Sequence, residues 1–456
     1  MKKQMFAFIK RLILIAFPIV LQQLFLNFAS LLDTLMVGQL DEISISGVYV
    51  ATQIVFVFNM MMFGTVEGAG VFFSQYFGTK DEEHMRKCYA LKYVLSISFA
   101  IVGMVVLFTF GRDIASLFVS TEAELDIAVS YLNIVISSSI PFAITVTLSS
   151  TLRESHKTFT PMIITFIGIM FNLLFNYLFI YGIGPFPQLG GVGAAIGTFI
   201  NRIVEMTLLV LIVLIKKEKF NKNLFHSFKI EKDLLKKIIK KSIPLFLNET
   251  LWSLSQFTLV YFFSKADPLA TTVLPIVTTI FNLLFVVMLG VGQGVSILVA
   301  NSVGESKFDT AQKEAYYSLI ITVIVNLVLG AVLFICSDLI VSLYSGVGLQ
   351  AREIASYLIK FDGIYLIVSG INLTLFFLLR AGGKTEIVFL FDSCFCWLIS
   401  IPFAIILVNF TNMDFKTLYV LVYSIEIIKA IVGMILLLSK KWYKNLVVDS
   451  NIESVN

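Results

Sequence analysis

The sequence predicts an all-α integral membrane protein with twelve transmembrane helices in two pseudo-symmetric six-helix lobes. Three observations lead to this fold class: the composition, a series of long apolar runs, and an internal repeat. Of the 456 residues, 58% are hydrophobic and 14% are charged, whereas a soluble domain carries about 25% charged residues. A water-soluble fold of this length could not bury so much apolar surface, and we therefore exclude a soluble protein.

The apolar runs are long enough for helices that cross a bilayer, which requires about 20 residues each. The first run continues without a charge from Leu12 to Leu32, longer than the roughly 7–15 residues of a signal-peptide core, and it is interpreted as a retained helix. Continuous runs also exclude a β-barrel, whose strands alternate. The predicted spans are 12–36, 47–75, 93–110, 128–150, 161–182, 190–215, 242–264, 272–300, 316–336, 356–379, 387–408 and 417–438.

The charges of the connecting segments predict the orientation. One side of the membrane would carry the N-terminus, the C-terminus and each connection from an even-numbered span to the next odd-numbered span. The segments on that side contain 27 Lys and Arg residues, and the opposite loops contain four. Cytoplasmic loops are enriched in these residues. We therefore expect a multi-pass protein of the cell (inner) membrane with both termini in the cytoplasm.

An internal repeat relates the two halves. Pro18 matches Pro244, Gly64 matches Gly290, and Gly68 matches Gly294, each 226 residues apart. Six spans separate the copies, so both have the same orientation, a common transporter design with the substrate between the lobes. The predicted division is an N-terminal lobe over 1–215, a basic cytoplasmic linker over 216–241, and a C-terminal lobe with its tail over 242–456.

Several segments resemble one family. LLDTLMVGQL, GAGVFFSQYFGTKD and LRESHKTFTPMIITFIGIMFNLLFNYLFIYG, with GQGVSILVANSVGESK and LLRAGGKTE in the second half, are similar to the MATE family of multidrug and toxin extrusion transporters. The resemblance covers about residues 10–440. It implies a two-lobed antiporter that exports small organic cations in exchange for H⁺ or Na⁺ by alternating access. It also implies that the first helix bends at Pro18 on protonation.

Asp33 is the strongest candidate for cation coupling, because it is an acid inside an apolar span with no neighbouring base. It lies at the edge of a polar helical stripe, and Asn172 and Asn176 share one face of the fifth span. Two carboxamides can serve a charged or a protonated carboxylate, and the family places these positions together. A bound Na⁺ could use the same groups. The stripe consists of Gln23, Asn27, Ser30 and Thr34. Of these residues, Gln23, Asn27 and Ser30 are assigned to the substrate cavity.

The second lobe is predicted to contribute negative charge to the same substrate cavity. Glu249, Ser253 and Gln256 share a face of the seventh span, and Glu249 is the repeat position of Gln23. Because Asp33 is matched by Leu259, ion coupling is expected to centre on the first lobe. Glu67 lies deep in the second span and is a further cavity candidate.

The other acids within spans are each expected to be stabilised by a base on the same helix or by water at the membrane interface. Glu205 lies three residues after Arg202, and Glu426 lies three residues before Lys429, so each acid is expected to pair with the base on its own helix. Asp362 and Asp392 are expected near helix ends, in contact with interfacial water.

The sequence also excludes several classes of function. The basic residues form short clusters between spans, so no nucleic-acid partner is indicated. The three His lie outside the spans, the four Cys form no disulfide framework or metal site, and no P-loop is present. We therefore expect no cofactor, no enzyme and no resident metal, in a monomer embedded in lipid. A flippase for lipid-linked glycans, built on a related two-lobed plan, remains the alternative.

Overall fold

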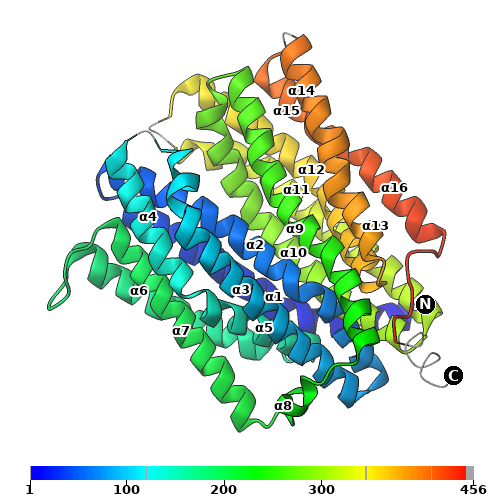
Figure 1. Cartoon of the computed structure of the whole chain (residues 1–456). Coiled ribbons are helices and arrows are strands. Elements are labelled where there is room, and N and C mark those ends of the chain that lie inside the picture. The colour runs from blue at the N-terminus through cyan, green and yellow to red at the C-terminus, as the bar shows by residue number, and fades with distance from the viewer. Residues whose placement is uncertain (1, 120, 345–346, 412, 448–456) are drawn as a thin grey trace. The chain divides into compact units, whose positions relative to one another are not determined.

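The computed structural model describes residues 2–119, 121–344, 347–411 and 413–447, and in these ranges the chain is helical without a strand (Figure 1). The tail assigned to the second lobe includes residues 448–456, which lie outside the described residues. The helices of the first half are α1 (Lys2–Val37), α2 (Glu42–Thr79), α3 (Glu82–Ser116), α4 (Glu122–Ser137), α5 (Ser139–Glu154), α6 (Phe159–Tyr181) and α7 (Gly191–Ile215).

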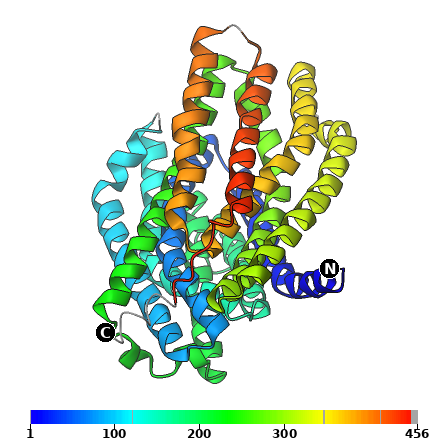
Figure 2. The same cartoon turned by 90° about the vertical axis from the view of Figure 1, so that its right-hand side faces the viewer.

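A connection with two short helices, η1 (Lys219–Asn221) and α8 (Leu224–Ser227), leads to the second half. Figure 2 shows its α11 and α12 in yellow-green and yellow, lying beside one another. The elements of this half are α9 (Lys232–Ala266), α10 (Ala270–Gly304), α11 (Phe308–Ser342), α12 (Leu349–Ala381), α13 (Thr385–Phe389), the π-helical η2 (Leu390–Cys394) and η3 (Cys396–Ser400), α14 (Ile401–Phe410), α15 (Phe415–Ser424) and α16 (Glu426–Leu438).

Ten helical segments of the described chain are long and apolar enough to cross a membrane. The predicted fourth span is instead a pair, α4 and α5, bent by 51°. The predicted seventh span lies in α9, which is 35 residues long but carries a row of polar residues between Asn248 and Gln256 that lowers its hydropathy. The helices therefore account for all twelve predicted spans.

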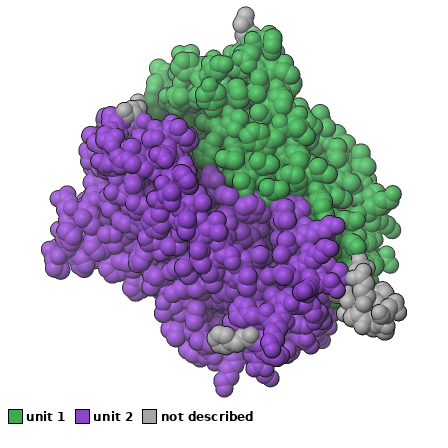
Figure 3. All heavy atoms as spheres, viewed as in Figure 1, with its two compact units in different colours: residues 1–20, 247–456 green, residues 21–246 purple. Residues whose placement is uncertain are grey.

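The chain forms two compact units (Figure 3). Unit 1 contains residues 1–20 and 247–456, and unit 2 contains residues 21–246. Whereas the predicted boundaries keep α1 and α9 each within one lobe, the compact units divide both helices. Each division follows one of the repeated prolines, Pro18 and Pro244, by two residues.

In each unit, a pair of glycines packs against the segment of a divided helix that comes from the other half of the chain. In unit 2, a Cβ at Gly64 of α2 would lie 2.8 Å from the Cα of Phe246, and one at Gly68 would lie 2.4 Å from the Cα of Ser242. Small residues four apart let two helix backbones approach closely in membrane proteins. These contacts flank Pro244 of α9.

Unit 1 repeats this arrangement. A Cβ at Gly290 of α10 would lie 2.9 Å from the Cα of Val20, and one at Gly294 would lie 2.9 Å from the Cβ of Ala16. The contacted positions flank Pro18 of α1 and match Phe246 and Ser242 in the repeat. The duplication read from the sequence is therefore also a duplication of helix contacts.

A buried hydrogen bond is duplicated as well. In unit 2 the hydroxyls of Ser96 and Thr147 lie 2.9 Å apart, and in unit 1 those of Thr322 and Thr374 lie 2.8 Å apart. All four residues are buried. Each bond joins the third span of its half to the fourth, which fixes the helix register at equivalent places in the two units.

Candidate functional site

The structure brings the three predicted coupling residues together in unit 2. Asp33 lies near the end of α1, and Asn172 and Asn176 lie one turn apart on α6. The Asn176 side chain donates from Nδ2 to the Asp33 carboxylate, 2.6 Å away, and to Asn172 Oδ1 at 3.4 Å. Asn176 is fully buried, Asn172 is 3% exposed, and Asp33 is half-buried. A carboxylate that remains accessible is thus held by a buried amide.

The position of Asn176 depends on a glycine in the neighbouring helix. A Cβ at Gly197 of α7 would lie 1.8 Å from Asn176 Oδ1, so only a residue without a side chain leaves room for this carboxamide. Among the described residues, no hydrogen-bond partner of that Oδ1 atom is found. The oxygen is therefore available as an acceptor close to Asp33.

The polar stripe of α1 is partly satisfied by its own helix. Asn27 donates to the backbone oxygen of Gln23 at 3.0 Å, and Thr34 donates to that of Ser30 at 2.9 Å. Gln23 and Asn27 are half-buried and Ser30 is exposed. The stripe therefore keeps accessible surface on the helix that carries Asp33.

One residue of α1 that sequence reasoning missed is Gln22. It is 5% exposed, donates to the Thr165 hydroxyl at 2.9 Å, and accepts from Arg153 at 3.3 Å. It ties α1 to α6 and to the end of α5. Its partners are more than 130 residues away in sequence, so no local pattern could have identified it.

The remaining predicted cavity residues lie on α2 and α9. Glu67 is half-buried on α2, next to Gly68. Glu249 and Gln256 are half-buried on α9, while Ser253 is fully buried and donates to the backbone of Thr250 at 2.8 Å. These three residues of α9 belong to unit 1.

The structure corrects one of the two predicted local ion pairs. Lys429 and Glu426 are paired as predicted, with N and O atoms 3.6 Å apart. Arg202 is not paired with Glu205: its guanidinium donates to the backbone of Val135, to Ser138 and, at 3.2 Å, to Asn59. These acceptors lie on α4, at its end and on α2, and tertiary contacts have replaced the expected contact along the helix.

The predicted contact of Asp362 with interfacial water is wrong, and Asp392 has an ion partner that the sequence did not reveal. Asp362 is 1% exposed and accepts hydrogen bonds from Tyr419 at 3.2 and 3.3 Å. Asp392 lies 2.6 Å from the Lys429 ammonium. A partner 37 or 57 residues away cannot be read from helix spacing, which is why both carboxylates looked unpaired in the sequence.

Four buried cations in the described chain have partners, and the first of them, Lys87, contacts Glu231 at 2.6 Å. Lys92 contacts Glu154 at 2.5 Å, Lys429 contacts Asp392, and Arg202 has the three acceptors given above. The Arg202 guanidinium also lies 4.4 Å from the ring centroid of Phe142. These groups are engaged by the protein itself, unlike the cations that a pyrophosphate-binding cavity would need.

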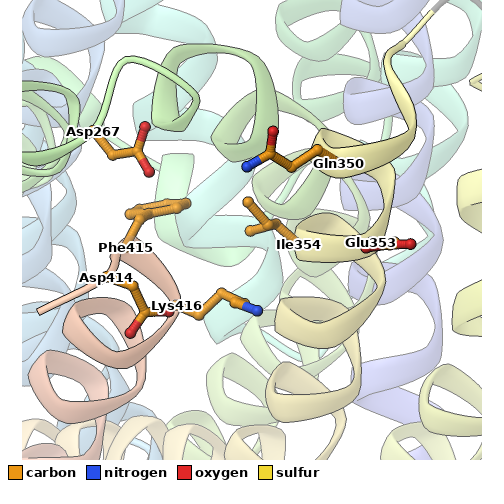
Figure 4. A pocket seen from close by; sticks show the side chains of 7 residues that line it. All are labelled: Asp267, Gln350, Glu353, Ile354, Asp414, Phe415 and Lys416. Carbon is orange, nitrogen blue, oxygen red and sulfur yellow. The ribbon is translucent and has the colours of Figure 1, made fainter.

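A surface hollow of about 360 Å³ lies in unit 1, at the ends of α9, α12 and α15. Figure 4 shows the Lys416 side chain extending from α15 toward α12, which carries Ile354. The hollow contains none of the predicted coupling residues. It is lined by Asp267, Gln350, Glu353, Ile354, Asp414, Phe415 and Lys416.

Comparison with proteins of known sequence places the chain among transporters. A probable multidrug resistance protein NorM of Bacillus cereus is 24% identical over 90% of each chain, and one of Thermotoga maritima is 23% identical over 96% of this chain and 94% of its own. The chain is also similar to an uncharacterized transporter, YisQ, of Bacillus subtilis, at 25% identity over 86% of this chain.

Solved structures share the fold. An outward-facing multidrug resistance MATE family transporter of the MOP superfamily superimposes with a TM-score of 0.88 over 95% of this chain and 96% of its own, at 16% identity. A MOP superfamily transporter from Pyrococcus furiosus, described as having a binding pocket of reversed polarity, gives a TM-score of 0.87 over 94% of this chain and 95% of its own, also at 16% identity. The twelve-helix membrane fold is thereby confirmed.

The family model for MatE matches the chain twice, over residues 18–178 and 244–406. The two matches begin at Pro18 and Pro244, the first pair of the internal repeat. They cover more than half of the chain and both units. The chain therefore belongs to the MatE family, and it is a multi-pass membrane transporter and not an enzyme.

Proposed function

We propose that this protein is a cation-coupled multidrug antiporter that exports organic cations in exchange for H⁺ or Na⁺. The observation that carries the proposal is the bond between Asn176 and Asp33, which holds an accessible carboxylate inside a membrane-spanning helix bundle. An intramembrane carboxylate is costly and marks an ion pathway by default. The relatives named multidrug resistance protein NorM support drugs as the substrate class.

The site has the groups that a single positive charge requires. A proton on Asp33 would remove its charge and supply a donor for a neighbouring amide oxygen. A sodium ion would instead take oxygen ligands from Asp33 and from the Asn172 or Asn176 carboxamides. In either case the neutralised and charged forms favour different packings of α1 against α6, which couples the ion to the conformation.

Transport is proposed to proceed by alternating access, in which the two units move with respect to one another. α1 and α9 each contribute to both units and continue through a proline. A proline lacks the backbone donor and locally weakens a helix. Pro18 therefore provides a bending point in the helix that also carries Asp33.

The test is ethidium transport by purified full-length protein in proteoliposomes, under a proton gradient and separately under a sodium gradient. Asp33→Asn keeps the size and hydrogen bonding of the side chain and fixes it as neutral, so it should abolish gradient-driven transport. Asn172→Ala should lower the rate less. Asp126→Asn, at an exposed position in the same unit, is the matched control and should transport normally. Wild-type rates of Asp33→Asn under both gradients would refute the assignment and make Glu249 the next candidate.

A further inference from the structure

A partly buried charge network in unit 1 has no role in the function proposed above. Lys429 of α16 lies 2.6 Å from Asp392 of η2 and 3.6 Å from Glu426 of its own helix. Asn248 of α9 donates to the second oxygen of Asp392 at 3.0 Å. Two carboxylates thus share one ammonium, and the network lacks one positive charge.

The two carboxylates are more accessible than the ammonium. The side chains of Asp392 and Glu426 are 15% and 18% exposed, and that of Lys429 is 9% exposed. A ligand that enters from the exposed side would therefore meet negative charge before it meets Lys429.

A second observation is a buried acceptor with an unused lone pair at the same place. Asn372 of α12, 4% exposed, donates to the Glu426 carboxylate at 2.9 Å, but no partner for its Oδ1 atom is found among the described residues. Leaving a buried acceptor without a donor costs about 1–3 kcal/mol. The same carboxamide that holds Glu426 therefore offers an unused oxygen to a donor or cation at this place.

One aromatic ring completes the surroundings of the ammonium. The Lys429 Nζ atom lies 5.4 Å from the centroid of the Phe391 ring. A cation between a carboxylate and an aromatic face is the arrangement by which proteins recognise organic ammonium groups. Lys429 thus occupies the kind of environment that an organic cation would seek.

The backbone at Asp392 is also unusual. Asp392 lies in a π-helical segment, and a second such segment follows at Cys396–Ser400. π-Helical turns are rare and occur frequently at functional sites. Asp392 therefore lies in a turn of a kind that is frequent where proteins bind ligands.

We propose that Asp392 and Glu426 form a binding site for an organic cation, in which Lys429 is a tethered competitor that occupies the site when no ligand is present. An arriving cation takes the place beside Asp392 and Phe391, and Lys429 remains paired with Glu426. The inference rests on the proposed export of organic cations, but it concerns unit 1 and is independent of Asp33.

The experiment measures equilibrium binding of ethidium and of tetraphenylphosphonium to the purified full-length protein. Lys429→Met removes the competitor and should tighten binding by about tenfold, and Asp392→Asn and Glu426→Gln should each weaken it by about tenfold, in line with the coupling of close charge pairs. Lys360→Met breaks the Lys360–Asp338 pair, an ion pair of unit 1 with N and O atoms 2.9 Å apart. This control should bind like the wild type.

The double variant Asp392→Asn/Lys429→Met covers the case in which Lys429→Met fails to fold because its carboxylates lose their counter-charge. This double variant should regain thermal stability but should not regain ligand binding. If the ion pair were purely structural, the double variant would regain both thermal stability and binding. Binding that is unchanged in all variants, or weakened by Lys429→Met in folded protein, overturns the site alone. Wild-type protein that binds neither probe overturns the site together with the proposed function.

Discussion

Gly197 determines whether Asn176 can reach Asp33, although it contacts no ion itself. An added methyl group at this position would overlap Asn176 Oδ1, at 1.8 Å, and would lie 3.1 Å from the backbone oxygen of Asn172. The overlapping atom is the end of a side chain, which can rotate away. We therefore expect Gly197→Ala to displace the carboxamide while the helices remain packed.

The predicted result for Gly197→Ala is a gradient-driven ethidium transport rate about tenfold or more below that of the wild type. A hydrogen bond to a charged group contributes about 1.5–3 kcal/mol, and 1.4 kcal/mol corresponds to a factor of ten. In Gly111→Ala, the control, the new methyl group meets the terminal methyl of Leu132 at 2.9 Å, and transport should be retained. If Gly197→Ala/Asn176→Ala transports more slowly than Asn176→Ala alone, Gly197 acts through something other than Asn176.

Residue-level sequence reasoning succeeded where the chemistry is local or the family supplied the partner. The Glu426–Lys429 pair follows from a spacing of three residues on one helix. Asp33 was selected because an acid in an apolar span requires an explanation, and the resemblance to MATE transporters supplied Asn176, which contacts it. The role of Asp33 in coupling stays a prediction. The contact between Asp392 and Lys429 joins two elements 37 residues apart, and helix periodicity contains no information about such a contact.

At the level of helices, the paired glycines are the positions where the close contacts leave least room for a larger residue. At Gly68 an added Cβ would lie 2.4 Å from the Cα of Ser242, and at Gly290 it would lie 2.9 Å from that of Val20. Both collisions involve backbone atoms, which cannot rotate away. Closely packed interiors lose about 1–3 kcal/mol on overpacking, so Gly68→Ala and Gly290→Ala should lower the apparent melting temperature of the detergent-solubilised protein.

Gly348→Ala is the matched control for this pair of substitutions. Gly348 precedes α12 with φ −58°, which any residue adopts, and nothing lies within 4 Å of the position of its Cβ. Its melting temperature should match that of the wild type. Equal melting temperatures for all three variants would show that the two α1 and α9 crossings tolerate separation, and would contradict the close backbone approach.

Helix positions were predictable because apolar length decides membrane insertion, but helix shape was not. The predicted span 128–150 lies within the bent pair α4 and α5, whose break at Ser138 comes just before Pro141 in the first turn of α5. Pro141 has no backbone donor for the preceding turn and weakens the helix there, but apolar length alone hid this break. The division of α1 after Val20 was equally hidden. The repeat indicated that Gly64 and Gly290 are equivalent. It did not indicate that each of them contacts one of the two helices, α9 and α1, that the compact units divide.

The orientation of the whole chain in the membrane remains a prediction from its loop charges, and single cysteines can test it. Lys229 is an exposed residue of the basic connection between α7 and α9, and Gln188 is an exposed residue of the loop between α6 and α7. Six spans separate the N-terminus from the basic connection and five separate it from the Gln188 loop. The two positions should therefore lie on opposite sides, with Lys229 in the cytoplasm.

A membrane-impermeant maleimide applied to intact cells should label Gln188→Cys and leave Lys229→Cys unlabelled, and both should react after permeabilisation. The unsubstituted protein provides the background from its native cysteines, of which Cys88 and Cys396 are buried. Labelling of both positions from outside would place an even number of spans between them, which contradicts the single span, α7, that separates them in the twelve-span topology. Labelling of Lys229→Cys alone would keep twelve spans and invert the protein, and the ten lysines of segment 216–241 would then lie on the side opposite to that which the positive-inside rule requires.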